Sequence, residues 1–450
     1  MKNVLTFFFV LLPFTLTARD ITVPLGQKIS TYAAQANAGD RLLLQAGTYE
    51  DQDYITLKAG ISVKGAGKDR TLVKVKQWAW YTGFFNLRDT PGSNGNIEIS
   101  DMTLDGQNVS WSAVRNEELG AIKIHDIIIR NFYRSAIELV GYKSTLPLQN
   151  IEIYNFLIEN SSNENNSSAN GNIQAYGFLN NIMIHHGTII HNNGDELDDP
   201  LIPQEARGFG KSGYAIKFQE TYDADNGYQA VTGKITNSRF YALKMVAKAT
   251  SKFNGGYTPT INFEFFNIET ENIEISDCDF NSALSLEKEN SRKPALSAYV
   301  RNNRFKVIQG VSSVLEIALS NVVVEDNEFN WLENKVTNVW GAAGQYNGKT
   351  TLLTGQRIRR NKFLFYNQNP ILFRYDSAIG DWIFEYNTII GGSPTVLGFQ
   401  GSTSAGSQTV TIQGNTFQYT FTPVGYVNTT ESVSKPAVIN VNNNKTNAVN

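Results

Sequence analysis

The chain has 450 residues, of which 12% are aromatic and 18% charged, and its formal net charge is -3. So few charges and so many aromatic rings exclude a disordered or coiled-coil protein, and the near-neutral charge excludes nucleic acid or an anionic membrane as the main partner. One domain of this length is unusual unless the chain is a solenoid, in which each coil needs only its neighbours to bury its core.

Residues 1–18 are predicted to be a signal peptide. Lys2 provides a basic start, residues 4–16 are apolar, and Ala18 ends a small-residue cleavage site. The apolar run is short for a membrane span, which needs about 20 residues, and no later segment is longer. No cysteine follows the cleavage site. We therefore expect a secreted or periplasmic mature chain that starts near Arg19, with no lipid anchor and no membrane span.

The next segment, residues 26–39, carries apolar side chains at helical spacing, namely Ile29, Tyr32, Ala33 and Ala36. A solenoid must seal its open end, because exposed apolar ends aggregate. We expect a short amphipathic helix that caps the N-terminal end.

After residue 40 one phrase recurs: two short alternating runs of Ile, Val or Phe around an Asn or Asp. Its copies begin at Asn96, Asn150, Asn181, Asn272 and Asn321, with degenerate copies from Ile358 and Thr411. Alternation places every second side chain in a core, and Asn or Asp suits a tight bend with left-handed backbone. The repeat predicts an all-β, right-handed parallel β-helix over residues 19–427, with stacked Ile and Phe, hydrogen-bonded Asn ladders and a polar, fraying tail at 428–450.

Cys278 is the only cysteine and lies in one of these repeats. It cannot form an internal disulfide, so the fold must be stabilised by burial and hydrogen bonding. We expect a buried structural thiol and not a nucleophile.

The opening of the chain resembles that of the pectate-lyase-like β-helix proteins. The similarity lies in Thr22-Val-Pro-Leu-Gly26, Ala38-Gly-Asp40, Ala46-Gly-Thr-Tyr49, Ile61-Ser-Val-Lys-Gly-Ala-Gly67 and Leu104-Asp-Gly106. This superfamily contains polysaccharide lyases, glycoside hydrolases and epimerases. The resemblance implies the fold for the whole chain, but it specifies the reaction poorly, since the Arg-rich lyase phrases and the Asn-Thr-Asp and Gly-His-Gly motifs of polygalacturonases are missing.

Four segments share a further pattern that predicts a site. They are Ser135–Leu139, Tyr214–Phe218, Tyr241–Met245 and Ser282–Leu286. If they are equivalent strands of different coils, Glu138, Lys217, Lys244 and Ser285 point outward in one column, each beside an alanine. A row of outward alanines is unusual on a bare sheet, so we expect a polysaccharide or a loop against this face.

The two lysines favour β-elimination on a uronate. Lys217 and Lys244 would lie on neighbouring strands, where one cation neutralises the substrate carboxylate and depresses the pKa of the other, which then acts as base. Tyr214 and Tyr241 are the expected proton donors. Glu138, Ser285 and Arg239 are the expected substrate-binding residues.

Two alternatives remain open from the sequence. A glycoside hydrolase needs two carboxylates, for which the acidic loop of Asp195, Glu196, Asp198 and Asp199 together with Glu220 is the candidate. The same loop, through Asp195, Asp198 and Asp199, could instead bind Ca²⁺; no other cofactor is expected. The second alternative is a non-catalytic glycan-binding surface protein.

Histidines and aromatic residues add weaker expectations. His185 and His186 should face opposite ways on a strand, so a zinc site is not expected, and His186 is a candidate general base. The Trp78, Trp80 and Tyr81 cluster either stacks on sugar rings or packs beneath loops. The expected partner in each case is a polysaccharide.

Overall fold

The computed structural model describes residues 18–90, 92–117, 119–161, 171–191, 196–197, 208–209, 214–247, 261–286, 295–306, 314–330, 338–340, 353–365, 371–375, 379–391, 395–399, 409–419, 427–428 and 438–448. The statements below concern these residues. The signal peptide predicted for residues 1–18, apart from Ala18, and the predicted calcium ligands Asp195, Asp198 and Asp199 lie outside them.

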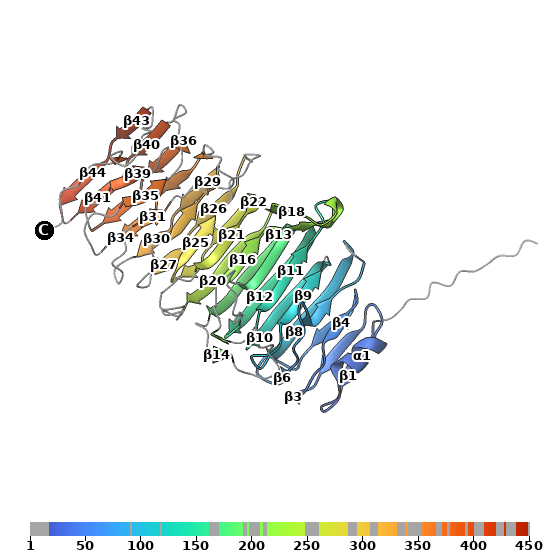
Figure 1. The fold of residues 1–450 in the computed structure, drawn as a ribbon. Helices are drawn as coiled ribbons and strands as arrows, with labels where there is room; N and C mark the ends of the chain where they lie inside the picture. The colour runs from blue at the N-terminus through green and yellow to red at the C-terminus, as the bar shows by residue number, and fades with distance from the viewer. Residues whose placement is uncertain are drawn as a thin grey trace, which may run out of the picture.

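The strands stack as parallel coils into a long right-handed β-helix, which confirms the predicted fold (Figure 1). Sheet A runs along one side and each of its strands pairs in parallel with the equivalent strand of the next coil. Its main strands are β1 (Asp20–Val23), β2 (Arg41–Leu44), β5 (Ser62–Lys64), β8 (Asn94–Asp105), β10 (Gly120–Arg130), β12 (Leu148–Glu159), β13 (Gly171–His191), β20 (Arg239–Ala247), β23 (Ile273–Ser276), β26 (Ala298–Arg301), β29 (Val322–Glu325), β33 (Arg357–Arg359), β37 (Trp382–Glu385) and β40 (Thr409–Gln413).

Sheet B forms a second side and positions the candidate site. In stacking order it contains β4 (Ile55–Leu57), β7 (Gly83–Leu87), β9 (Ser112–Glu117), β11 (Ser135–Gly141), the first part of β13, β16 (Tyr214–Gln219), β21 (Ile261–Phe266), β25 (Ala283–Leu286) and β28 (Leu315–Ile317). β13 turns from sheet B into sheet A at Gly177, whose φ is +85°.

The helix α1 (Ile29–Gln35) lies at the N-terminal end of the stack (Figure 1). Ile29 and Ala33 are buried, so its apolar face covers the first coil as the helical spacing predicts.

Asn and Asp occupy the bends within sheet A, as predicted. Asn96, Asn150, Asn181 and Asn272 share one bend, with φ between +44° and +58°, a region that Asn tolerates better than most residues. A second bend further along each coil carries Asp101, Asp126, Asn155, His186, Ala242, Asp277, Asn302 and Asp326, all with positive φ.

Two internal ladders confirm how the coils stack. One buried asparagine column runs through Asn303, Asn327, Asn361, Asn387 and Asn415, and each amide Nδ2 donates to the next Oδ1 at 2.9–3.1 Å. Beside it, Phe280, Phe305, Phe329 and Phe363 stack with ring centroids 4.5, 4.6 and 4.9 Å apart. The hydrogen bonds of the asparagine column and the stacking of the phenylalanine rings thus fix how each coil of the C-terminal half is aligned with the next.

The coil continues beyond the boundary predicted at residue 427. β43 (Val438–Asn442) and β44 (Lys445–Ala448) pair in parallel with β40 and with β41 (Thr416–Tyr419). The physical reason is Asn444, which accepts from Asn415 at 2.9 Å and so adds one more rung to the ladder. None of the helices in the described part of the chain has the length and apolarity to cross a membrane.

Candidate functional site

Charged and polar side chains form a buried column on the outer face of sheet B. The strand register aligns Arg115, Glu138, Gln174, Lys217, Glu264, Ser285 and Glu316. Their neighbours in sequence, such as Ile216 and Phe218, fill the core. All but Glu316 are less than a tenth exposed, so these side chains have little contact with solvent.

The predicted pairing of Lys217 with Lys244 is wrong. Lys217 lies on β16 in sheet B, whereas Lys244 lies on β20 in sheet A, where its neighbours are Thr188 and Asp279. β16 and β20 belong to one coil, because both pair with β13, β16 with its first part and β20 with its last part. Between them lie β17 (Thr221–Asp223), β18 (Gln229–Val231) and β19 (Gly233–Thr236). Lys244 is exposed on a different side of the solenoid, so the two ammonium groups are not neighbours.

Lys217 instead pairs with a carboxylate that the sequence analysis did not select. Its Nζ lies 3.0 Å from Glu264 Oε2, and the Tyr214 and Phe266 rings lie 4.4 and 5.1 Å from the same ammonium group. Burial raises the pKa of Glu264, and the adjacent Lys217 opposes that shift. The pair is sealed from solvent, which separates Lys217 from a substrate in this conformation.

Two coils away, Glu138 lies between two arginines. Arg134 Nε lies 3.1 Å from Glu138 Oε1, Ser112 Oγ donates to the same oxygen at 2.8 Å, and Arg115 Nη1 contacts Glu138 Oε2. Burial lowers the pKa of Arg115, but the carboxylates of Glu138 and Glu117 have the larger combined effect, so the pKa of Arg115 is raised above its usual value. Arg134 also stacks over the Trp111 ring at 4.9 Å. This network holds both guanidinium groups in fixed positions.

A cavity of ≈ 340 Å³ opens beside this network, at the ends of the sheet B strands. It is lined by Tyr81, Arg115, Arg134, Val140, Tyr142, Tyr176, Gln219, Glu220, Thr221, Tyr222 and Ala230. Two arginines and four tyrosines therefore meet a single carboxylate, Glu220, among the described residues that line the cavity. We call it the tyrosine pocket.

Arg134 and Tyr176 are in direct polar contact in the tyrosine pocket, with Arg134 Nη2 donating to the Tyr176 hydroxyl oxygen at 2.7 Å. Burial raises the pKa of Tyr176 to about 12, although Arg134 works in the opposite direction. Burial also raises the pKa of Tyr142, whose hydroxyl accepts from Arg115 Nη2 at 3.5 Å. Both phenols therefore hold their protons at neutral pH.

The structure brings together five of the predicted site residues. Glu138, Lys217 and Ser285 lie in the column, Tyr214 lies beneath Lys217, and Glu220 lines the tyrosine pocket. Ser285 Oγ donates to Glu316 Oε2 at 3.0 Å.

Four predicted residues, Lys244, Tyr241, His186 and Arg239, belong to sheet A instead, on or beside β20. Arg239 pairs with Glu274 at 3.1 Å. Tyr241 ends a stack of four rings, His125, Tyr154, His185 and Tyr241, with centroids 4.6, 5.2 and 4.6 Å apart. Because these rings cover one another's faces, we interpret the stack as structural.

The expectation that His185 and His186 face opposite ways is also wrong. Their Nδ1 atoms lie 2.8 Å apart, because the positive φ of His186, +50°, breaks the alternation of the strand. His185 Nε2 lies 3.3 Å from Glu152 Oε1. Among the described residues no group of three or more His, Cys, Asp or Glu side chains is arranged to hold a metal ion.

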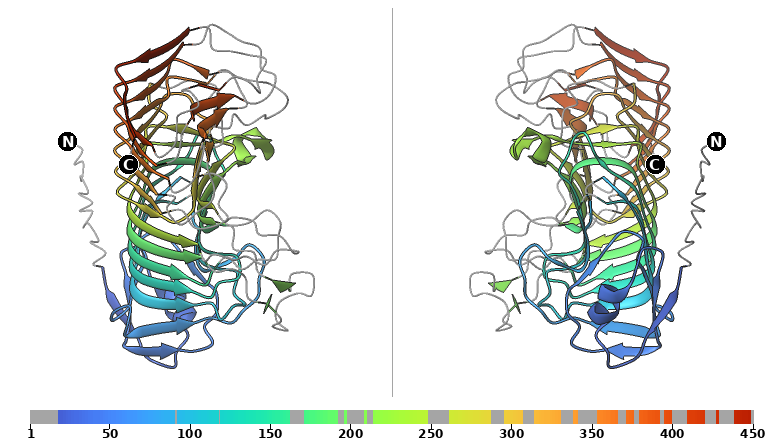
Figure 2. Two further views of the ribbon diagram at one scale, coloured as in Figure 1. Left: turned by 90° about the vertical axis from the view of Figure 1, so that its left-hand side faces the viewer. Right: turned by 90° about the vertical axis from the view of Figure 1, so that its right-hand side faces the viewer.

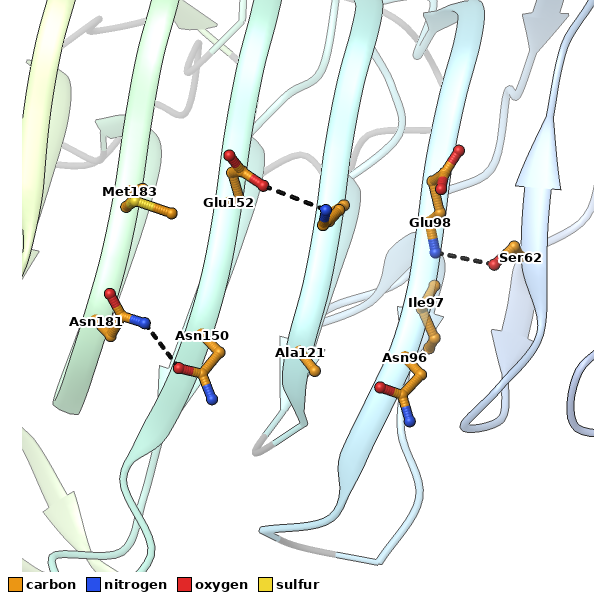
Figure 3. Close-up of a pocket in the computed structure, with 10 residues that line it drawn as sticks. Ser62, Asn96, Ile97, Glu98, Ala121, Asn150, Glu152, Asn181 and Met183 are labelled. Atoms are coloured by element: carbon orange, nitrogen blue, oxygen red, sulfur yellow. Dashed lines mark hydrogen bonds and ion pairs between the residues drawn. The ribbon is translucent and has the colours of Figure 1, made fainter.

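A second cavity, of ≈ 380 Å³, is a groove on the outer face of sheet A. Figure 3 shows that its side chains come from successive coils: Asn96, Ala121, Asn150 and Asn181 at the bend, and Glu98, Glu152 and Met183 above them. Asn181 Nδ2 donates to Asn150 Oδ1 at 2.8 Å, and Lys123 Nζ lies 3.6 Å from Glu152 Oε2. These polar groups form hydrogen bonds and ion pairs with one another between coils. We therefore interpret the groove as part of the ordinary outer surface of the solenoid and not as a reactive site.

The sequence analysis missed Glu264, Arg134 and Tyr176. Glu264 had a visible signal, because Phe263 and Phe265 alternate with it just as Ile216 and Phe218 alternate with Lys217. Arg134 lies just before β11, outside the alternating pattern, and Tyr176 is one of many alternating residues in β13. Neither residue therefore has a local sequence pattern that indicates a site.

No family model and no curated protein matches the sequence. Solved structures do match, as β-helices. The PfbA surface adhesin of Streptococcus pneumoniae is 11% identical, with a TM-score of 0.47, and the match covers 94% of this chain and 87% of that one. The mannuronan C-5 epimerase AlgE6 A-module of Azotobacter vinelandii is 12% identical (TM-score 0.40; 94% of each chain). A family 28 exopolygalacturonase of Yersinia enterocolitica is 11% identical (TM-score 0.42; 94% and 78%). At such identities the likeness concerns the fold alone.

Proposed function

We propose that this chain acts on carbohydrate and cleaves an acidic, uronate-containing polysaccharide by β-elimination in the tyrosine pocket, after export directed by the predicted signal peptide. The observation that carries the proposal is the Arg134–Tyr176 contact of 2.7 Å in a cavity that contains two arginines and one carboxylate. A guanidinium group suits a uronate carboxylate, because it offers a planar fork of donors.

The residues can be assigned to the steps of the reaction. Arg134 and Arg115 stabilise the charge that develops on the substrate carboxylate when the C5 proton is removed. Glu220 accepts that proton, and the electron pair of the C5–H bond forms the C4=C5 double bond. The C4–O bond breaks, and Tyr176, whose phenol is protonated at neutral pH, gives its proton to the leaving oxygen.

Glycoside hydrolysis is the second candidate, supported by one observation. Glu264 and Glu316 lie in the same column with Ser285 between them. Two strand spacings place their backbones about 10 Å apart, near the carboxylate separation of about 6.5–9.5 Å in inverting enzymes. The hydrolase reading ranks second because Glu264 is buried against Lys217, whereas the tyrosine pocket is open.

The test is a screen of the purified protein on alginate, polygalacturonate and glycosaminoglycans, read for ultraviolet absorbance of unsaturated products and for reducing ends. We expect both signals together. Tyr176→Phe should lower kcat at least about 100-fold, the usual scale for losing a general acid, while Tyr386→Phe, an exposed control outside the pocket lining, should not. Reducing ends without absorbance would select the hydrolase, and an unaffected Tyr176→Phe variant would refute the assignment.

A further inference from the structure

Exposed aromatic side chains are concentrated around the tyrosine pocket. Among the described residues, the exposed Trp and Tyr side chains are Trp80, Tyr81, Tyr222, Tyr228 and Tyr386. Tyr81 and Tyr222 line the pocket, Trp80 adjoins Tyr81, and the Tyr228 ring lies 6.2 Å from that of Tyr142. Four of these five therefore border one cavity, whereas most other aromatic rings in the described part of the chain are buried or half-buried, and the fold gains little from leaving these four in water.

The first pair, Trp80 and Tyr81, lies between β6 (Thr71–Lys74) and β7. Tyr81 is 64% exposed and has φ +55°, a backbone conformation that is costly for a bulky residue. Buried rings support it from below, since the Trp111 centroid lies 5.0 Å from that of Trp80 and 5.4 Å from that of Tyr81. The guanidinium group of Arg134 also stacks over the Trp111 ring, so the same buried ring contacts both the aromatic pair and this guanidinium group.

The second pair, Tyr222 and Tyr228, lies on the hairpin of β17 and β18, which projects from the stack (Figures 1 and 2). Ala224 N donates to Tyr142 O at 2.7 Å, and Thr145 N donates to Asp225 Oδ2 at 3.0 Å. Asp223 accepts from Asp225 N at 2.9 Å and closes the turn. The hairpin is therefore fixed to the segment that carries Tyr142, and it contributes Tyr222 to the lining of the pocket.

We infer that these two aromatic segments are platforms for the sugar units on either side of the cleaved bond, so that the substrate is an extended acidic chain lying across the strand ends of sheet B. The inference rests on the proposed function. The segments adjoin β7 and β16, which are four strand positions apart, or about 19 Å at 4.8 Å for each strand. Such a span exceeds one sugar unit. Aromatic faces bind the C–H faces of sugars, while Arg115 and Arg134 bind the carboxylates between them.

Binding should therefore depend on chain length. The experiment uses the full chain carrying Tyr176→Phe, so that bound polymer is not cleaved, with alginate and polygalacturonate polymers and their unsaturated disaccharides as probes in calorimetry. Tyr81→Ala and Tyr222→Ala should each weaken polymer binding about tenfold and leave disaccharide binding unchanged. Tyr386→Ala, an exposed tyrosine in a bend between β37 and β38 (Thr388–Ile390), is the matched control and should change neither.

Polymer affinity that survives both substitutions would overturn the inference, as would failure of both polymers to bind. If Tyr81→Ala and Tyr222→Ala weaken polymer binding but the wild-type chain yields no unsaturated product, the aromatic platforms stand and the lyase proposal fails. If cleavage occurs with unchanged affinity in both variants, the proposed function stands without the platforms.

Discussion

Lys217 Nζ and Glu264 Oε2 lie 3.0 Å apart on adjacent strands of sheet B, with 8% and 4% of their side chains exposed. Removing one partner of a buried pair leaves an uncompensated charge, which costs about 3–5 kcal/mol. Lys217→Met should lower the free energy of unfolding by that amount, measured by denaturant titration at neutral pH. The double variant Lys217→Met/Glu264→Gln should recover much of the loss, because no charge remains. A loss below about 1 kcal/mol in the single variant would show that the pair is hydrated in solution.

The ring stack on sheet A should make the protein less stable in mild acid. Burial lowers the pKa of His185, so the folded pKa lies below the unfolded value of 6.5. The unfolded chain then binds more protons below pH 6.5, and stability is lost as the pH falls through that value. The neighbouring His186 imidazole, whose Nδ1 lies 2.8 Å from that of His185, also lowers the pKa of His185.

The matched variant is His185→Tyr, because tyrosine already occupies the neighbouring rungs Tyr154 and Tyr241 and would keep the stacking. We expect the difference in unfolding free energy between pH 7.5 and pH 5.5 to shrink in this variant. An equal difference in both proteins would assign the acid sensitivity to other groups.

The asparagine ladder should be intolerant of apolar replacement. Asn361 Oδ1 accepts from Asn327 N and Nδ2, and Asn361 Nδ2 donates to Val324 O and to Asn387 Oδ1. Asn361→Leu would leave several buried groups without partners, at about 1–3 kcal/mol for each. We expect a loss of at least about 3 kcal/mol in chemical denaturation. The control is Leu243→Met, because Leu243 is a buried apolar residue that directly follows the same bend in an earlier coil. This replacement of one apolar side chain by another of similar volume should cost less than about 1.5 kcal/mol. Equal losses in the two variants would disprove the role of the ladder.

The repeat predicted the β-helix because its alternation, its bend residues and its stacked Ile and Phe all specify one coil. Cys278 shows how far this extends: it is buried in the position that Asn303 occupies one coil later, and its N–H donates to Asn303 Oδ1 at 3.0 Å. Burial raises the pKa of this thiol to about 12, which supports the structural role expected for it.

The site was harder to predict because local patterns do not say which sheet a strand joins. Tyr214-Ala-Ile-Lys and Tyr241-Ala-Leu-Lys look equivalent and lie 27 residues apart, which suggests the same strand in two successive coils. They are instead two strands of one coil, one in sheet B and one in sheet A, because the β17–β18 hairpin lengthens the chain between them. The orientation of His186 depends on one positive φ. The tyrosine pocket joins residues from five separate segments, and only the three-dimensional register brings Arg134 to Tyr176.

The anchor of the β17–β18 hairpin provides the last prediction. The backbone and the hydroxyl of Thr145 both donate to Asp225, and these bonds lower the pKa of that carboxyl. Thr145→Val preserves the shape of the side chain but removes the hydroxyl bond to Asp225. We expect the KM for the polymer that the screen identifies to rise about fivefold with unchanged kcat, because Tyr222 is held less firmly while Arg134 and Tyr176 are untouched. Thr48→Val, exposed on β3 (Gly47–Tyr49), should change neither constant. A fall in kcat at constant KM would instead place the hairpin in the chemical step.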